Sequence, residues 1–198
     1  MKIRRLLATK CIHYIVTRLG PDFLRKLAFD EKYRSGIWNF PGESAGELGL
    51  VVRRYLRKGD LLVMGCGGAS ILEGLEADGL NSALGVDLSE EALRLASRYT
   101  SKKVSFQQIN MMDFVSSRSF DVILFSESLN YVPAVLQKPF LGRMVEYLKP
   151  GGVLIVTLAQ AKRYKAILER IRLNFAVLED RTFIGSSRHM IIFRVAQT

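Results

Sequence analysis

The chain has few of the residues that build disulfide scaffolds and metal sites, with two cysteines and two histidines among 198 residues. Cys11 and Cys66 lack the spacing of metal ligands, and Cys66 stands among glycines, where a disulfide would be awkward. We therefore expect no metal site. Free thiols favour a reducing, cytoplasmic location.

Long apolar runs are also missing. The longest, such as residues 153–159, fall far short of the roughly 20 residues that a membrane-spanning helix needs. The N-terminus begins like a secretory signal, but Lys10 and Arg18 interrupt its apolar part and no small-residue cleavage site follows. We expect it to belong to the mature protein and no segment to cross a membrane.

Acidic residues are scarce at both ends of the chain. Residues 1–34 hold nine Lys or Arg against three acids, and residues 151–198 hold eight against three, out of a net charge of +10. Such ends could meet a phosphorylated substrate, nucleic acid or an anionic membrane surface, and a basic face that meets only solvent stays open as well. No aromatic-rich basic stripe supports nucleic acid, so we do not expect it as a partner.

What is present from residue 59 onward is an alternation of short apolar runs and helical patterns, typical of a parallel sheet covered by helices. The last two runs, joined through Gly185, indicate an antiparallel hairpin at one edge. We predict an α/β fold: a doubly wound, mostly parallel, Rossmann-like sheet of seven strands with helices on both faces. The expected strands are 60–64, 83–87, 104–109, 120–125, 152–158, 174–183 and 188–196, and the expected helices are 70–77, 89–99, 135–148 and 162–172.

Upstream, apolar residues at mostly helical spacing and a segment opening with Pro21 predict two short helices. Residues 35–46 resemble a linker. We expect residues 1–45 to form a helical appendage and lid, and residues 46–198 to form the main domain.

The run "LLVMGCGGAS" at residues 61–70 ends a strand in a glycine turn. Without Cβ atoms the backbone can approach a ligand closely at the carboxyl end of the strand, although a tight turn alone would also use glycine. The next strand ends at Asp87, 22 residues after Gly65, where a carboxylate can accept hydrogen bonds from ribose hydroxyls. Ser70 stands where a dinucleotide fold would need glycine, which weakens the pyrophosphate interpretation.

These motifs resemble those of the class I S-adenosylmethionine-dependent methyltransferases over most of the chain. The matching stretches are "LLVMGCGGA", "LGVDLSEEAL", "NMMDF", "SFDVILFSESLNYV" and "YLKPGGVLIVT". The resemblance implies S-adenosylmethionine as cofactor. It places Gly65, Cys66 and Gly67 at its methionine and ribose part, Asp87 with Leu88 at the ribose, Met112 and Asp113 at the adenine, and Ser126 and Glu127 at the methionine end.

Two positions depart from the family pattern. Val63 replaces an acid that would help to hold the amino group of the cofactor, and Ala69 replaces the last glycine of the turn. A degenerate, non-catalytic site therefore stays open. The segment "YRSGIWNF" is similar to the lid of small bacterial methyltransferases of the nodulation and carbohydrate-modifying group, which implies that Tyr33 and Trp38 close over the cofactor, with anchoring of the linker as the alternative.

Methyl transfer from a sulfonium needs alignment, and a base only where the acceptor must lose a proton. Glu127 and Tyr131 follow the fourth strand and are the candidate catalytic residues, whereas His13 and His189 fit structural or exposed positions better. The Asn-Pro-Pro-Tyr sequence of base-amino methyltransferases is absent. We expect oxygen or nitrogen of a small molecule, sugar-containing or anionic, as acceptor. A nicotinamide-dependent oxidoreductase and a non-catalytic binding protein are the alternatives, and the oligomeric state is not predicted.

Overall fold

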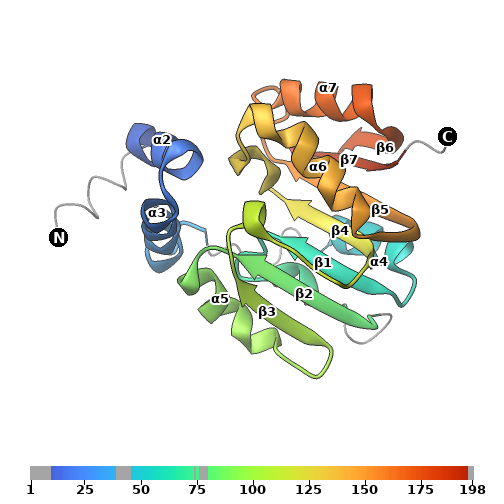
Figure 1. Cartoon of the computed structure of the whole chain (residues 1–198), viewed down its shortest axis with the longest axis horizontal. Coiled ribbons are helices and arrows are strands. Elements are labelled where there is room, and N and C mark those ends of the chain that lie inside the picture. The colour runs from blue at the N-terminus through green and yellow to red at the C-terminus, as the bar shows by residue number, and fades with distance from the viewer. Residues whose placement is uncertain (1–9, 39–45, 74, 76–79, 196–198) are drawn as a thin grey trace.

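The computed structural model describes residues 10–38, 46–73, 75 and 80–195. Its seven strands form one sheet in the order β3-β2-β1-β4-β5-β7-β6 (Figure 1). The first five run parallel, and β7 is antiparallel to both β5 and β6. The predicted fold class is confirmed. The strands are β1 (Asp60–Met64), β2 (Ser82–Asp87), β3 (Val104–Gln108), β4 (Phe120–Ser126), β5 (Leu148–Leu158), β6 (Ala176–Thr182) and β7 (His189–Arg194).

Strand β1 shows why the central strands are apolar throughout. Successive side chains point to opposite faces of a strand. Leu61 and Val63 accordingly join one hydrophobic cluster, and Leu62 and Met64 join the other. Helices cover both faces of the sheet, so side chains on both sides of the strand are buried and apolar. In a sheet with one solvent-exposed face, every second residue would be polar instead.

Helices cover each face of the sheet. Side chains of α4 (Glu47–Leu56) belong to the first cluster, and side chains of α6 (Gln137–Glu146) and α7 (Lys165–Asn174) belong to the second. Helix α5 (Glu90–Ala96) begins at the cap that the sequence predicts, because the Ser89 hydroxyl accepts a bond from the Ala92 N–H at 3.1 Å.

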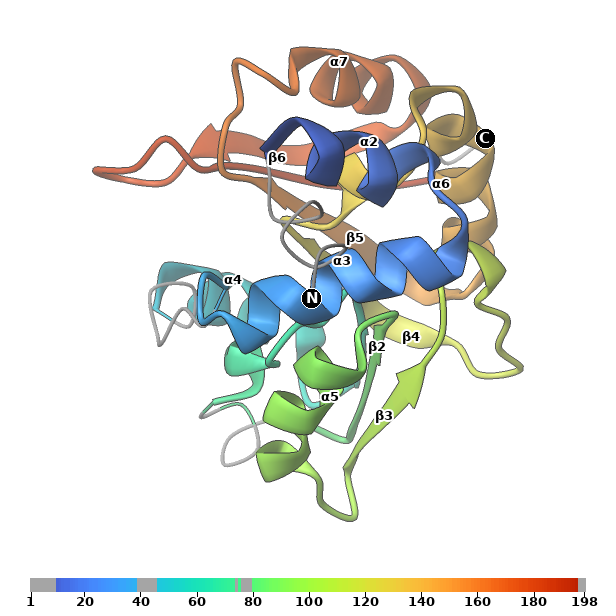
Figure 2. The ribbon, with the colours of Figure 1, turned by 90° about the vertical axis from the view of Figure 1, so that its left-hand side faces the viewer.

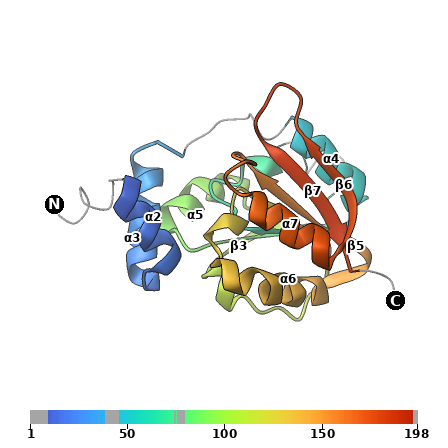
Figure 3. The ribbon, with the colours of Figure 1, turned by 90° about the horizontal axis from the view of Figure 1, so that it is seen from above.

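Two further helices, α2 (Lys10–Leu19) and α3 (Asp22–Arg34), lie beyond the carboxyl ends of the parallel strands (Figure 1). The side view shows them crossing in front of that end of the sheet (Figure 2), and the view from above shows them together at one end of the molecule (Figure 3). The predicted pair of N-terminal helices is thus confirmed. The division of the chain at residue 45 stays a prediction, since residues 39–45 lie outside the described residues.

The predictions of individual helices were less accurate. The helix expected over 70–77 is wrong where the structure describes it, since only a 3-10 turn, Ser70–Leu72, is present. Helix α4 was missed altogether: the prediction began the main domain at residue 46 without assigning a helix there. None of the helices in the described part of the chain is long and apolar enough to cross a membrane.

Candidate functional site

The glycine turn follows β1 and has left-handed backbone at three positions: Gly65 (φ +66°), Gly67 (φ +54°) and Ala69 (φ +55°). The loop is held by a bond from the Cys66 N–H to the Val86 carbonyl (2.9 Å) and one from the Ala69 N–H to the Cys66 carbonyl (2.9 Å). Ala69 thus adopts the conformation that glycine usually supplies, and the departure from the family pattern leaves the turn intact. The burial of Cys66, a free thiol, raises its pKa well above the ordinary value.

Gly65 is required sterically as well. A Cβ at this position would lie 2.6 Å from the Cβ of Ser128, whose hydroxyl donates to the Met64 carbonyl at 2.6 Å. The glycine therefore lets the segment after β4 pack directly on the end of β1.

We expect Gly65→Ala to lower the free energy of unfolding by about 2 to 4 kcal/mol. The alanine would have to adopt a positive φ, and its Cβ would also clash with the Cβ of Ser128. Gly142→Ala in α6 is the control: nothing lies within 4 Å of the added Cβ. It should raise stability by about 0.5 to 1 kcal/mol through helix propensity. Urea denaturation measures both, and equal effects of the two substitutions would contradict the assigned role of Gly65.

Asp87, at the end of β2, connects this strand to the glycine turn. Its Oδ2 accepts from the Gly67 N–H at 2.9 Å and its Oδ1 from the Ser89 N–H at 2.8 Å. Burial raises its pKa to about 6, although those backbone bonds act in the opposite direction. Some of its surface remains accessible, because a cavity reaches it.

That cavity has a volume of about 760 Å³ and opens at the carboxyl ends of β1, β2 and β4. Its size is that of a small-molecule or cofactor site. Ten of the twelve site residues predicted from the sequence line it: Tyr33, Trp38, Gly65, Cys66, Gly67, Asp87, Leu88, Ser126, Glu127 and Tyr131.

The other two predicted residues, Met112 and Asp113, are not among the lining residues, and Asp113 is exposed. Asn110 and Met111 line the cavity in their place. The Asn110 side chain caps the 3-10 turn Met111–Asp113 by accepting from the Met112 N–H at 3.1 Å. A contact of Met112 and Asp113 with adenine stays a prediction. Asparagine before a short turn is a capping signal that could have drawn attention to residue 110.

Helix α3 forms the roof of the cavity through Arg25, Phe29 and Tyr33. Phe29 meets the ring of Tyr131 edge-on, with 5.1 Å between centroids, and Tyr33 meets Trp38 edge-on at 5.4 Å. The Tyr33 hydroxyl lies over Gly67, where it would be 2.6 Å from an added Cβ. Burial raises the pKa of Tyr33 well above its ordinary value, and Asp87 acts in the same direction, so the phenol stays neutral.

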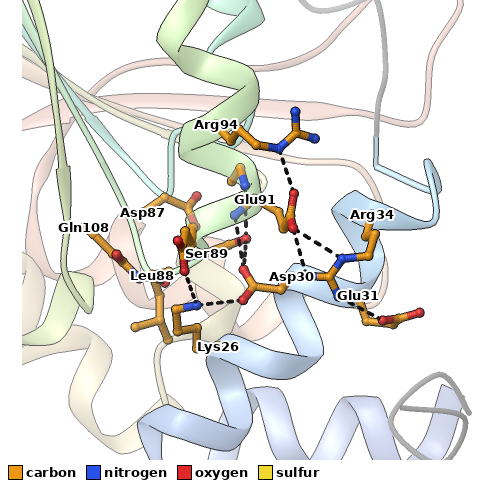
Figure 4. Close-up of polar contacts among 12 residues, drawn as sticks. Lys26, Asp30, Glu31, Arg34, Asp87, Leu88, Ser89, Glu91, Arg94 and Gln108 are labelled. Carbon is orange, nitrogen blue, oxygen red and sulfur yellow. Dashed lines mark hydrogen bonds and ion pairs between the residues drawn. The ribbon is translucent and has the colours of Figure 1, made fainter. Parts of the chain in front are cut away.

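Ion pairs attach this roof to α5 (Figure 4). Asp30 of α3 accepts from the Ser89 hydroxyl at 2.6 Å, and Lys26 bridges Asp30 (2.8 Å) and Glu90 (3.0 Å). Burial alone would raise the pKa of Asp30, but the bonds from Lys26 and Ser89 outweigh it and lower the pKa. We call this set of contacts, together with the pair of Arg34 and Glu91 at 2.8 Å, the α3–α5 clamp.

Glu127 follows β4 with left-handed backbone (φ +56°). Its carboxylate accepts from the Ala159 N–H, and its Oε1 lies 3.1 Å from Nε of Arg188 without a hydrogen bond of good geometry. Burial raises the pKa of Glu127, although the Ala159 N–H and Arg188 act to lower it. Arg188 also lines the cavity, and only the folding of the C-terminal hairpin brings it there.

Tyr131 is half-buried in the segment after β4. Its ring packs on Phe29, and the Arg18 guanidinium lies 5.2 Å from the ring centroid. Burial raises the pKa of Tyr131 to about 12, so it stays protonated at neutral pH. His189 lies on the hairpin, where it contacts Asp180 at 2.6 Å, and it does not line the cavity. The side chain of His13 lies outside the described residues.

Residues 62–156 match the family model described as a methyltransferase domain. This stretch runs from β1 to β5 and holds the glycine turn, Asp87 and Glu127. This match covers just under half of the chain and supports a methyltransferase domain over these residues. Within the part of this domain that the structure describes, no group of three or more His, Cys, Asp or Glu residues could hold a metal ion.

The chain is similar to a ubiquinone biosynthesis O-methyltransferase of Rickettsia akari, with 28% identity over 165 residues, covering 72% of this chain and 63% of the relative. It therefore spans less than two thirds of the length of that curated relative.

Two solved structures share the fold. The DhpI complex with S-adenosylhomocysteine (SAH) gives a TM-score of 0.69 at 18% identity, covering 93% of this chain and 98% of DhpI. The N-methyltransferase NodS from Bradyrhizobium japonicum WM9, also with SAH, gives a TM-score of 0.62 at 18% identity, covering 99% of this chain and 97% of NodS.

Proposed function

We propose that this protein transfers the methyl group of S-adenosylmethionine to oxygen or nitrogen of a small-molecule acceptor. The observation that carries the proposal is the pairing of the Asp87 carboxylate with the Gly67 N–H at 2.9 Å beside a cavity of about 760 Å³. This pairing places a carboxylate that can accept hydrogen bonds from ribose hydroxyls next to backbone without Cβ atoms, and a nucleoside cofactor needs both.

The residues present fit that cofactor. Gly65 and Gly67 keep the turn free of Cβ atoms, which would lie 2.6 Å from the Ser128 side chain and from the Tyr33 hydroxyl. Asp87 would accept from the ribose hydroxyls, and Ser126 with Glu127 would face the methionine end. The cofactor supplies an electrophilic methyl group on a sulfonium. Tyr33 and Trp38 would cover the site from the roof and exclude water.

On the acceptor side, the lining holds the aromatic cluster of Phe29, Trp38 and Tyr131. These rings contact one another, with centroids 5.1 to 6.2 Å apart, so they form a wall rather than a cage around a cation. Glu127 would take the proton of the acceptor through Oε1, which lies 3.1 Å from Arg188 Nε, since its other oxygen accepts from the Ala159 N–H.

Charge in the cavity favours a neutral or anionic acceptor. Three arginines line it, Arg25, Arg98 and Arg188, against the two carboxylates of Asp87 and Glu127. The name of the Rickettsia relative, an O-methyltransferase of ubiquinone biosynthesis, also favours a small molecule and oxygen.

Cofactor affinity should depend on pH. The pKa of Asp87 is about 6 in the folded protein, and ribose hydroxyls donate to its ionised form. Affinity should therefore fall as the pH drops through about 6, becoming about tenfold weaker at pH 5 than at pH 7.5. Calorimetric titration with SAH, which lacks the sulfonium charge, measures this. A flat profile would contradict the role of Asp87.

The test of the function itself is calorimetric titration with S-adenosylmethionine and SAH, with NAD as the control. Micromolar binding of the sulfur compounds and none of NAD would support the proposal and justify a screen of sugars and small anions as acceptors. Binding of NAD alone would favour an oxidoreductase. Binding of none would favour a degenerate site, for which Val63 is the residue to examine.

A further inference from the structure

Arg188 enters the cavity from the loop between β6 and β7 and contacts Glu127, the base in the proposed methyl transfer. Its backbone N–H donates to the Ser186 hydroxyl at 3.0 Å. The Ser187 hydroxyl donates to the Ala159 carbonyl at 2.9 Å, and the N–H of the same Ala159 donates to Glu127. One short set of hydrogen bonds therefore positions Arg188 relative to Glu127, although the two residues are far apart in the sequence.

The fold uses the guanidinium of Arg188 only in part. Its Nε lies 3.1 Å from Oε1 of Glu127 without a hydrogen bond of good geometry. In the described part of the chain no well-formed hydrogen bond involves the guanidinium. The side chain is 24% exposed and lines the cavity. Because a guanidinium carries five N–H donors in a planar fork, Arg188 keeps donors for a ligand in the cavity.

The other two arginines of the lining are placed differently. Arg25 is buried and pairs with Asp22 at 3.2 Å. Arg98 is exposed, and its guanidinium lies 4.8 Å from the centroid of the Tyr99 ring. Of the three, Arg188 is the arginine in contact with Glu127. It is therefore the one that an acceptor bound beside the base would meet.

The charge around this end of the cavity is positive. Glu127 opposes Arg188, and Arg18 adds a second positive charge 5.2 Å from the ring centroid of Tyr131, which lines the cavity. The other carboxylate of the lining, Asp87, follows β2, and β1 separates β2 from β4 in the sheet. The surplus of positive charge favours an anion over a cation beside Glu127.

We propose that Arg188 binds a carboxylate or phosphate group of the acceptor and thereby selects acids among small molecules. A planar guanidinium matches both groups through paired N–H donors. Because Arg188 contacts Glu127, the acid group would lie a few bonds from the hydroxyl or amine that gives its proton to Glu127. This inference rests on the proposed methyl transfer for the identity of the ligand as acceptor, whereas binding of the acid group can be measured without turnover.

The experiment is calorimetric titration of the full chain, saturated with SAH, with benzoate, with phenyl phosphate and with benzamide as the uncharged control. The ring of these probes suits the aromatic wall of Phe29, Trp38 and Tyr131, and SAH fills the cofactor part of the cavity. Ionic strength is held at about 0.15 M. We expect at least one anion to bind with a dissociation constant of about 1 mM, and benzamide to bind at least about tenfold more weakly. The tighter anion shows whether the group is a carboxylate or a phosphate.

Variants of Arg188 attribute the binding to this side chain. Arg188→Gln should weaken anion binding by about tenfold to 100-fold and leave the affinity for SAH within about threefold of the wild type. Arg188→Lys keeps the charge without the planar fork and should give an intermediate loss. The control is Arg54→Gln, which removes an arginine that pairs with Glu179 on the exposed side of α4 and should bind as the wild type does. Thermal denaturation checks that each variant is folded.

Three results would overturn the proposal. The first is anions that bind no better than benzamide, and the second is equal anion binding in Arg188→Gln and the wild type. The third is anion binding that SAH abolishes together with a large loss of SAH affinity in Arg188→Gln, which would assign Arg188 to the carboxylate of the cofactor. Absence of SAH binding would instead contradict the proposed function, and the same titrations without SAH would still decide whether Arg188 binds an acid group.

Discussion

Replacing Asp87 with Ala is expected to weaken S-adenosylmethionine binding by about 100-fold or more. The carboxylate is the charged acceptor that would meet the ribose hydroxyls, and hydrogen bonds to a charged group contribute about 1.5 to 3 kcal/mol each. It also accepts from the N–H groups of Gly67 and Ser89, so its loss loosens the turn on which the cofactor lies. Calorimetric titration of the purified variant measures the effect.

Two companion variants make the result interpretable. Asp87→Asn keeps the size of the side chain but not its charge, and should also bind weakly. Glu169→Ala removes a carboxylate from the exposed side of α7, where its partner is Lys165 at 3.3 Å, and should bind as the wild type does. A dissociation constant for Asp87→Ala within about threefold of the wild type would show that the ribose does not lie at β2.

Replacing Glu127 with Gln is expected to lower kcat by about 100-fold to 10,000-fold with any acceptor that must lose a proton. Gln keeps the size of the side chain and cannot take the proton. Burial raises the pKa of Glu127, so wild-type activity should fall with decreasing pH at a pH above the ordinary range of a glutamate. Turnover is measured with an acceptor returned by the screen, across pH.

Cofactor titration separates the two roles that Glu127 could have. An unchanged cofactor affinity in Glu127→Gln, together with the lost turnover, is the result expected for a base. A large loss of cofactor affinity would instead assign Glu127 to the amino group of the cofactor, in place of the acid that Val63 replaces. Tyr131→Phe provides comparison: with its pKa at about 12, Tyr131 is neutral, and loss of its hydroxyl should cost about tenfold at most.

The local part of the site was predictable from the sequence because each element carries its own signal. The glycine turn needs residues that tolerate positive φ, and both Gly65 and Gly67 adopt positive φ. Asp87 stands at a strand end, and parallel strands bring their carboxyl ends to one edge of the sheet. The seven-stranded sheet was also predictable, because each strand is marked locally by its own apolar run.

The residues brought in from a distance were not predictable. Arg188 reaches Glu127 from the C-terminal hairpin, and Arg18 reaches Tyr131 from α2. Their positions depend on tertiary packing, which no local spacing encodes. The contact of Asp113 with adenine stays a prediction, and the structure adds Asn110 and Met111, just before it, to the lining of the cavity.

The α3–α5 clamp also bears on the speed of the proposed methyl transfer. It holds the roof at Ser89, two residues from Asp87, through Asp30 and Lys26 (Figure 4). If release of a nucleoside from beneath Tyr33 requires this roof to lift, the buried carboxylate of Asp30 beside Ser89 becomes exposed. Where opening of a lid is slow, release of product rather than chemistry sets the turnover rate. The contacts of the clamp would then also set how long the spent cofactor stays.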